Sequence, residues 1–125
     1  MCPDYNVTVA LGGSVYPTSL THVAHPASVT LLSGESGSVI SNTGAVGTVI
    51  YDLPASALGL NYRIVATTGQ LITVRPPAGV TIVKGTVTAT NANPITSATT
   101  GDWINVVNTS ATVWTVFASS VDWAI

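Results

Sequence analysis

The stretch from residue 61 to residue 85, NYRIVATTGQLITVRPPAGVTIVKG, shows how this chain of 125 residues is built. It holds three short runs rich in Val, Ile and Thr, namely LNYRIVAT (which begins at residue 60), QLITVR and GVTIV. Runs of β-branched residues favour strands over helices. The segments Thr68-Gly69 and Pro76-Pro77-Ala78-Gly79 separate the runs, and both are typical of turns. The stretch therefore predicts three strands joined by hairpin-like connections, as in a β-meander.

The same alternation of apolar run and turn continues through most of the chain. Almost no window shows the i, i+3, i+4, i+7 apolar spacing of an amphipathic helix. Further candidate strands are residues 5–11, 28–32, 37–42, 47–53, 85–90, 102–108, 112–118 and 121–125. We predict an all-β protein of one domain: an antiparallel β-sandwich or barrel with short hairpins over residues 28–125, preceded by an N-terminal strand and extended arm over residues 1–27.

The arm is predicted from residues 12–27, GGSVYPTSLTHVAHPA, which contain two prolines and a glycine pair but little alternation of polar and apolar residues. An extended arm of this kind is suited to docking on a neighbouring protein. We expect its larger and more polar residues to form an anchor or interface. They are Tyr16, Pro17, His22, His25 and Pro26.

The charge content limits the classes of function. Charged residues make up 6% of the chain, against about 25% in a typical soluble domain. A surface with so little charge favours a chain that works inside an assembly, although a neutral monomer covered by Thr and Ser is the alternative. The net charge of -2 argues against nucleic-acid binding, which needs several cations on one face. No apolar run approaches the length of about 18 residues that predicts a membrane span.

All three cations of the chain, Arg63, Arg75 and Lys84, fall within residues 61–85. Strand alternation places them at outward positions or at strand ends, where a meander would carry its few charges. A phosphate site would need a glycine-rich loop leading into a helix, and no such motif occurs. A second interpretation is that Arg63 or Arg75 pairs with Asp52 or Glu35, across strands or across a subunit boundary. Such a pair would set register and would not perform catalysis.

The residues available for catalysis or metal binding are few. The five carboxylates show no paired spacing, and no nucleophile motif is present, so we expect a protein that is not an enzyme. His22 and His25 alone are too few for a metal site, which needs three or four ligands. A threefold assembly would bring three copies of one histidine to its axis, which leaves a metal or anion there as an alternative to two solvent-facing histidines. We predict no cofactor.

The three tryptophans, Trp103, Trp114 and Trp123, all lie near the end of the chain. The segments that hold Trp103 and Trp114 have apolar residues at both parities, so both faces of the last hairpin are predicted to be partly apolar. One face can fill the core, and the other must be covered by another subunit or by a sugar ring. We therefore place all three tryptophans among the candidate core or interface residues, with stacking on a sugar ring as the alternative.

Two segments resemble a module of tailed-bacteriophage virion proteins: VISNTGAVGTVIYDLPASALGLNYRIVATTGQLITV and GDWINVVNTSATVWTVFASSVDWAI. The shared pattern is a strand, then Leu53-Pro54, a turn of small residues to Gly59, and Tyr62 in the next strand. A Thr-Gly turn and a closing hairpin with Trp114 and the terminal Trp123 complete it. It covers roughly residues 37–125. The module occurs in capsid decoration or head-fibre proteins and in the ends of tail fibres and spikes.

The resemblance implies a small β-sandwich or barrel that forms a homotrimer and has no active-site residues. It implies a virion structural protein that decorates or cements the exterior of the phage head, with the major capsid protein or another virion protein as partner. The start of the chain has no secretion signal, in keeping with assembly in the host cytoplasm and a final location in the virion. The alternative is a receptor-binding or glycan-binding tip, in which Tyr51, Tyr62 or Trp114 would be exposed.

Overall fold

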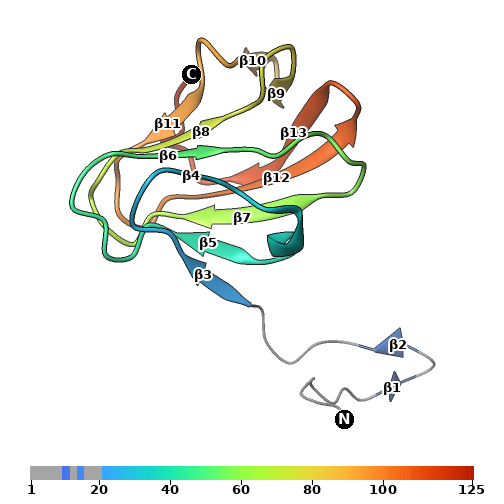
Figure 1. Cartoon of the computed structure of the whole chain (residues 1–125), viewed down its shortest axis with the longest axis horizontal. Coiled ribbons are helices and arrows are strands. Elements are labelled where there is room, and N and C mark those ends of the chain that lie inside the picture. The colour runs from blue at the N-terminus through green and yellow to red at the C-terminus, as the bar shows by residue number, and fades with distance from the viewer. Residues whose placement is uncertain (1–9, 12–13, 16–20) are drawn as a thin grey trace.

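Most strands of the chain form two sheets that pack face to face (Figure 1). The structure is a computed structural model that describes residues 10–11, 14–15 and 21–125. The seven-stranded sheet has the order β10 (Val87–Ala89), β9 (Thr81–Lys84), β13 (Val113–Ser119), β12 (Trp103–Ser110), β7 (Asn61–Val65), β5 (Val39–Ser41), β3 (His22–Ala24). The four-stranded sheet has the order β11 (Ile95–Ser97), β8 (Ile72–Arg75), β6 (Val49–Asp52), β4 (Val29–Thr30). The prediction of an all-β fold is confirmed.

Two smaller elements complete the description. Strands β1 (Ala10–Leu11) and β2 (Ser14–Val15) pair with each other as a separate two-stranded sheet. A 3₁₀ turn, η1 (Ser33–Glu35), lies between β4 and β5. Across the described residues there is no helix with the length and apolar character needed to cross a membrane.

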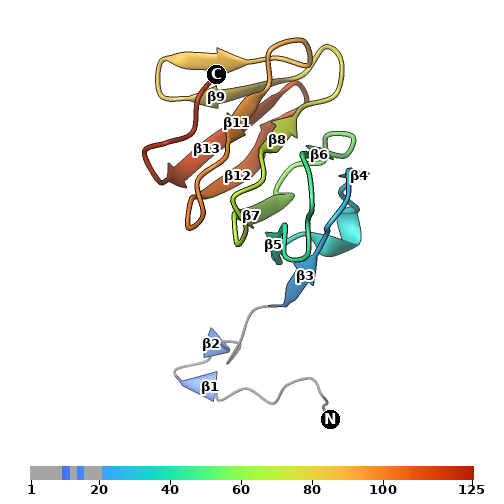
Figure 2. The same ribbon diagram turned by 90° about the vertical axis from the view of Figure 1, so that its left-hand side faces the viewer.

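From β3 to β8 the chain winds as a flattened coil that passes to the opposite sheet after every strand (Figure 2). Strands β3, β5 and β7 therefore lie parallel in one sheet, with Val23, Ile40 and Ile64 in register. Strands β4, β6 and β8 lie parallel in the other sheet. The prediction of an antiparallel sandwich is wrong for this half of the chain. A strand that returns to the same sheet after a full turn runs in the same direction as before.

The stretch over residues 61–85 is the clearest correction. It supplies three strands as predicted, but β7, β8 and β9 do not pair with one another: β7 pairs with β12 and β5, β8 with β6 and β11, and β9 with β10 and β13. The meander prediction is therefore wrong. The two turn segments at residues 66–71 and 76–80 carry the chain from one sheet to the other instead of closing hairpins.

Antiparallel pairing dominates the second half of the sandwich. Strand β12 pairs with both β13 and β7, β9 with β10, and β8 with β11, while β13 and β9 are parallel. The predicted short hairpins are present at β9–β10 and at β12–β13. Gly85, in the first of these turns, has a φ of 61°, a conformation that glycine adopts without steric cost.

The core lies between the two sheets and is built from alternate residues of the strands. Trp114 of β13 stacks on Tyr62 of β7, with ring centroids 6.0 Å apart. Each large apolar side chain buried here contributes about 1.5–3 kcal/mol relative to exposure. The largest fully buried side chains are Trp114, Tyr51, Tyr62, Leu31, Ile40, Ile64, Ile72, Ile82, Ile95 and Ile104.

The sandwich begins earlier in the chain than the predicted boundary at residue 28. Strand β3 pairs in parallel with β5, which places His22–Ala24 at the edge of the seven-stranded sheet and not in an extended arm. Backbone hydrogen bonds on both sides of β3 also attach this segment to the neighbourhood of β5: Val39 N donates to Thr21 O, and His25 N donates to Ser41 O. Tyr16 and Pro17 lie outside the described residues.

One buried side chain holds two successive turns of the coil together. Asn42, which has no exposed surface, follows β5. Its Oδ1 accepts hydrogen bonds from the backbone N of Thr67 (2.8 Å) and of Thr68 (3.1 Å), in the connection between β7 and β8. Its Nδ2 donates to Thr68 Oγ1 at 2.9 Å and to Gln70 O at 3.4 Å. This amide fixes the connection that crosses between the sheets.

We expect Asn42→Ala to lower the free energy of unfolding by about 2 kcal/mol, because it removes a fully buried amide and leaves the backbone N–H groups of Thr67 and Thr68, in part-buried contacts, without their acceptor. The measurement is urea unfolding followed by tryptophan fluorescence. The matched control is Asn91→Ala, since Asn91 is exposed and makes a single side-chain bond, to Pro76 O. The control should change the free energy by less than about 0.5 kcal/mol. Equal losses for the two variants would contradict this role of Asn42.

Candidate binding face

The structure divides the predicted aromatic residues between core and surface. Trp114 is fully buried and Trp123 is 4% exposed, so neither offers a surface to a partner in this chain. Tyr51 and Tyr62 are also buried, and the expectation that they or Trp114 would be exposed for sugar stacking is wrong. Trp103 is the exception, with 38% of its surface exposed. Tyr51, Tyr62 and Trp114 are buried because the alternation of their strands places them on the inner side of the sheets.

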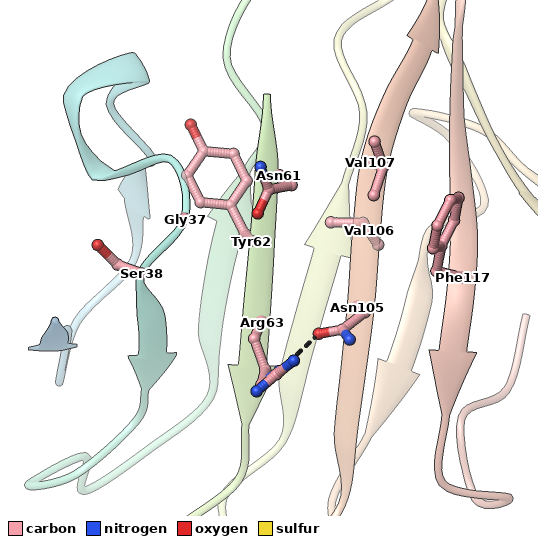
Figure 3. Close-up of a pocket in the computed structure, with 9 residues that line it drawn as sticks. All are labelled: Gly37, Ser38, Asn61, Tyr62, Arg63, Asn105, Val106, Val107 and Phe117. Atoms are coloured by element: carbon pink, nitrogen blue, oxygen red, sulfur yellow. Dashed lines mark hydrogen bonds between the residues drawn. The ribbon is translucent and has the colours of Figure 1, made fainter. Parts of the chain in front are cut away.

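The exposed side of the seven-stranded sheet, which faces away from the four-stranded sheet, is here called the outer face. Its central side chains are Asn61 and Arg63 of β7, Trp103, Asn105 and Val107 of β12, and Phe117 and Ala118 of β13. Arg63 and Asn105 are directly opposite in the antiparallel register. Arg63 Nε donates a hydrogen bond of 2.9 Å to Asn105 Oδ1 (Figure 3). The pair lies in the middle of the face.

Phe117 reaches the outer face through an irregularity in the β12–β13 hairpin. Asn105 pairs with Ala118 and Val106 pairs with Val116, so Phe117 is the extra residue of a β-bulge. Its side chain is 72% exposed, which is unusual for a phenylalanine in a central strand. No pattern in the sequence predicted this bulge, and Phe117 was not among the candidate site residues.

Two adjoining hollows run along the outer face. One, of about 270 Å³, is bordered by Asn61, Arg63 and Phe117, and the other, of about 290 Å³, by Arg63, Trp103 and Ala118. Asn105 borders both, and Figure 3 shows the residues that line the first of them. Together the two hollows form a shallow groove, here called the outer groove, with amide and guanidinium groups at its centre and an aromatic ring near each part. Shallow clefts that combine apolar surface with a few fixed polar groups are typical of ligand sites.

The two arginines have different partners. Arg75 of β8 pairs with Asp52 of β6, with Nε to Oδ1 at 2.6 Å and Nη2 to Oδ2 at 3.0 Å, which is one of the pairings considered from the sequence. Hydrogen bonding to Asp52 and the negative charge of that carboxylate raise the pKa of Arg75. Arg63 does not reach Asp52 or Glu35 and bonds to Asn105 instead. The ion pair joins parallel strands of the small sheet, far from the outer groove in the fold.

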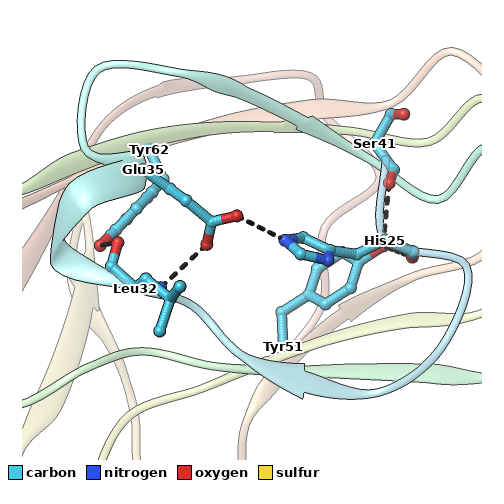
Figure 4. Close-up of polar contacts among 6 residues, drawn as sticks. All are labelled: His25, Leu32, Glu35, Ser41, Tyr51 and Tyr62. Carbon is cyan, nitrogen blue, oxygen red and sulfur yellow. Dashed lines mark hydrogen bonds and ion pairs between the residues drawn. The ribbon is translucent and has the colours of Figure 1, made fainter. Parts of the chain in front are cut away.

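The two histidines make bonds within the chain. His22 Nε2 lies 2.7 Å from Ser41 Oγ on the neighbouring strand. His25 Nε2 lies 2.8 Å from Glu35 Oε2, and Glu35 Oε1 accepts a bond from Leu32 N at 2.9 Å (Figure 4). Pro26 follows in an exposed position. The part of the chain that the structure describes contains no group of three or more His, Cys, Asp or Glu side chains able to hold a metal ion.

Two buried tyrosine hydroxyls fasten the segment that contains His25 and Glu35 to the sandwich (Figure 4). Tyr51 OH donates to His25 O at 2.5 Å, with Ser41 O at 3.1 Å. Tyr62 OH donates to Leu32 O at 2.8 Å. These contacts join β3, η1 and the core, so the cluster is structural.

Asp102, the buried carboxylate among the described residues, is also engaged in structure. Asp102, which is 5% exposed, accepts hydrogen bonds from Ser97 Oγ and Ser120 Oγ. Neither histidine contacts it in the described residues. The arrangement therefore lacks the base that would activate a serine.

Comparison with known proteins gives no family for this chain. No protein-family model matches the sequence, and no curated protein matches it.

We expect the fold to lose stability in alkali. Burial raises the pKa of Tyr51 to about 12, and burial together with the charge of Glu35 raises that of Tyr62 to about 12. Because an unfolded tyrosine has a pKa of about 10, the folded state holds these protons more tightly. The resulting stability is complete below pH ~10 and is lost as the pH rises towards 12.

The measurement is the urea midpoint at a series of pH values between about 8 and 12, a window that spans the ordinary and the raised pKa. The midpoint should fall over the upper half of this range, and it should fall less steeply in Tyr62→Phe and Tyr51→Phe. A midpoint that is flat up to the top of the range, or variants with the same slope as the parent, would show that the two phenols do not carry the effect.

Proposed function

We propose that this chain is a structural protein of a bacteriophage virion, a decoration or cement protein on the exterior of the head. In this proposal it acts as a homotrimer, with the major capsid protein as its partner. The β-sandwich is compatible with the fold that the resemblance to phage virion proteins implies. The observation that carries the proposal is the near absence of free charge on its surface.

The charges of the described residues are mostly used within the chain. Arg75 pairs with Asp52, Glu35 pairs with His25, and Asp102 is buried. The charged groups left without an ionic partner in the described residues are Arg63, Lys84 and Asp122. Three free side-chain charges among the described residues are few for a protein that stays dispersed as a monomer. A surface of this kind is suited to burial against other protein.

Exposed apolar side chains at the two ends of the sandwich support the same conclusion. Leu32 and Leu58, 63% and 75% exposed, lie in the connections that lead into β5 and β7. Val46 and Leu71 lie in the connections at the opposite ends of these strands, and Val46 is 94% exposed. Covering such residues in an assembly contributes about 25 cal/mol per Å² of apolar surface, before the cost of association. Many copies on one shell would add these contributions.

A second candidate function is a receptor-binding or glycan-binding module. It is favoured by the outer groove, where Trp103 and Phe117 are exposed beside the Arg63–Asn105 pair. The two functions are compatible, because a decoration subunit has one surface on the shell and another that faces the surroundings.

We expect the purified chain to form a trimer. Light scattering after size exclusion and native mass spectrometry should both give three times the mass of one chain, and the trimer should persist at high salt, since few charges are available to hold it. A single, freely soluble chain at high concentration would contradict the proposed assembly.

We also expect phage particles without this protein to be less resistant to heat or to a chelator than the parent particles. The physical reason is the loss of buried apolar area between neighbouring shell subunits. Adding back the purified protein should restore the resistance. Particles that keep full resistance without it would exclude a cement role and leave decoration alone.

A further inference from the structure

We infer that the outer groove binds a sugar that carries a carboxylate, such as a uronic or sialic acid, with Arg63 as the residue that recognises the acid. The inference rests on the second candidate function, and it adds the chemical class of the ligand. Three properties of the groove support it: an oriented cation, neutral hydrogen-bonding groups and exposed aromatic rings.

The cation is the guanidinium of Arg63. Of the three cations in the chain, Arg75 is bound to Asp52, and Lys84 Nζ lies 3.4 Å from the backbone O of Trp123. Arg63 has no carboxylate partner among the described residues, and only its Nε is bonded, to Asn105 Oδ1. That bond orients the guanidinium and leaves Nη1 and Nη2 able to donate. Two parallel N–H donors are the geometry that a carboxylate accepts best.

Neutral groups beside the cation match the hydroxyls of a sugar. Asn105 uses its Oδ1 for Arg63, which leaves the two N–H bonds of its amide for a ligand. Asn61 donates through Nδ2 to Gly59 O at 3.0 Å, which leaves its Oδ1 as an acceptor. Both side chains border the groove. A donor and an acceptor at fixed positions suit hydroxyl groups, which do both.

The aromatic rings supply the apolar part of the site. Phe117 borders the part of the groove near Asn61, and Trp103 borders the part near Ala118. Aromatic rings offer a large, rigid apolar surface for a small loss of conformational entropy. The C–H face of a pyranose can pack on such a ring while its hydroxyls reach the amides. The packing of the fold does not explain Phe117, which is 72% exposed, and Trp103 leaves 38% of its surface open to a ligand.

The position of the groove argues against other ligands. It lies over β7, β12 and β13, which are interior strands whose backbone groups already bond to neighbouring strands, so an extended peptide cannot add as a further strand. A single free arginine is also too little charge for nucleic acid or an anionic lipid surface. A small ligand with one negative charge fits the groove best.

The test uses the full chain and three probes: methyl β-D-glucuronide, the methyl glycoside of N-acetylneuraminic acid, and methyl β-D-glucoside as the neutral match of the glucuronide. Binding is followed by tryptophan fluorescence and by NMR shifts, with probes in the range of tens of millimolar because single sugars bind weakly. Among the tryptophans, all of which the structure describes, Trp103 is the exposed one and reports on the groove.

At least one acidic probe should bind about tenfold more tightly than the glucoside, which corresponds to about 1.4 kcal/mol. Arg63→Gln should abolish this preference, while Lys84→Gln, the matched control for loss of one cation, should keep it. Phe117→Ala should weaken all binding, while Val46→Ala, which removes an exposed apolar group far from the groove in the sequence and on another connection, should not. Salt should weaken binding of the acidic probe and leave the glucoside unchanged.

The other outcomes distinguish the acidic ligand inferred here from the glycan-binding function on which it rests. Equal binding of acidic and neutral probes would overturn the role of Arg63 and leave a neutral glycan site. Absence of binding by all three probes would overturn both the acidic ligand and the glycan-binding function, while the trimer and particle measurements would still stand for decoration. If Arg63→Gln or Phe117→Ala instead changes the mass of the native assembly, the outer face is an interface between copies, and the inference is wrong.

Discussion

The amide of Asn42 is the constraint on which the rest of the structure depends. By binding the backbone of residues 67 and 68 and the carbonyl of Gln70, it holds the connection after β7 against the connection after β5. These bonds favour a crossing of the chain to the other sheet after β7 over a return as a hairpin. Two parallel stacks of strands follow, and the core forms between them. A buried amide with its donors and acceptors satisfied favours one winding over the alternatives, because any other leaves these groups unpaired.

This winding also determines what the outer face presents. Strand β7 is the last strand that the coil adds to the seven-stranded sheet, and β12 of the later β12–β13 hairpin pairs with the edge of β7 that faces away from β5. Arg63 and Asn105, far apart in the sequence, then meet in register, and the bulge at Phe117 turns an aromatic ring outward. The small sheet, by contrast, uses Arg75 internally against Asp52. The two arginines thus have separate roles because their strands belong to different layers.

The strands themselves could be predicted from the sequence, because β-branched runs and turn residues are local signals. The pairing could not be predicted, because it depends on long-range contacts, such as the hydrogen bond that Thr67 N donates to Asn42 Oδ1, which no local pattern contains. Alternation placed Trp103 and Arg63 on definite sides of their strands, but only the assembled sheet shows which side faces the core. The Asp52–Arg75 pair was one of several pairings possible from the sequence, and it forms because the parallel register of β6 and β8 places the two residues side by side. Phe117 was missed because a bulge breaks the alternation.

The stacked arrangement of β3, β5 and β7 over β4, β6 and β8 has a consequence for how such a protein can change in size. Each turn of the coil contributes one strand to each sheet, and the first turn forms one edge of each sheet, at β3 and at β4. Duplicating a turn would widen both layers by one strand while the hairpin half, with its exposed rings, stays as it is. Length differences among descendants of this fold would then come in whole windings, added on the side away from the groove.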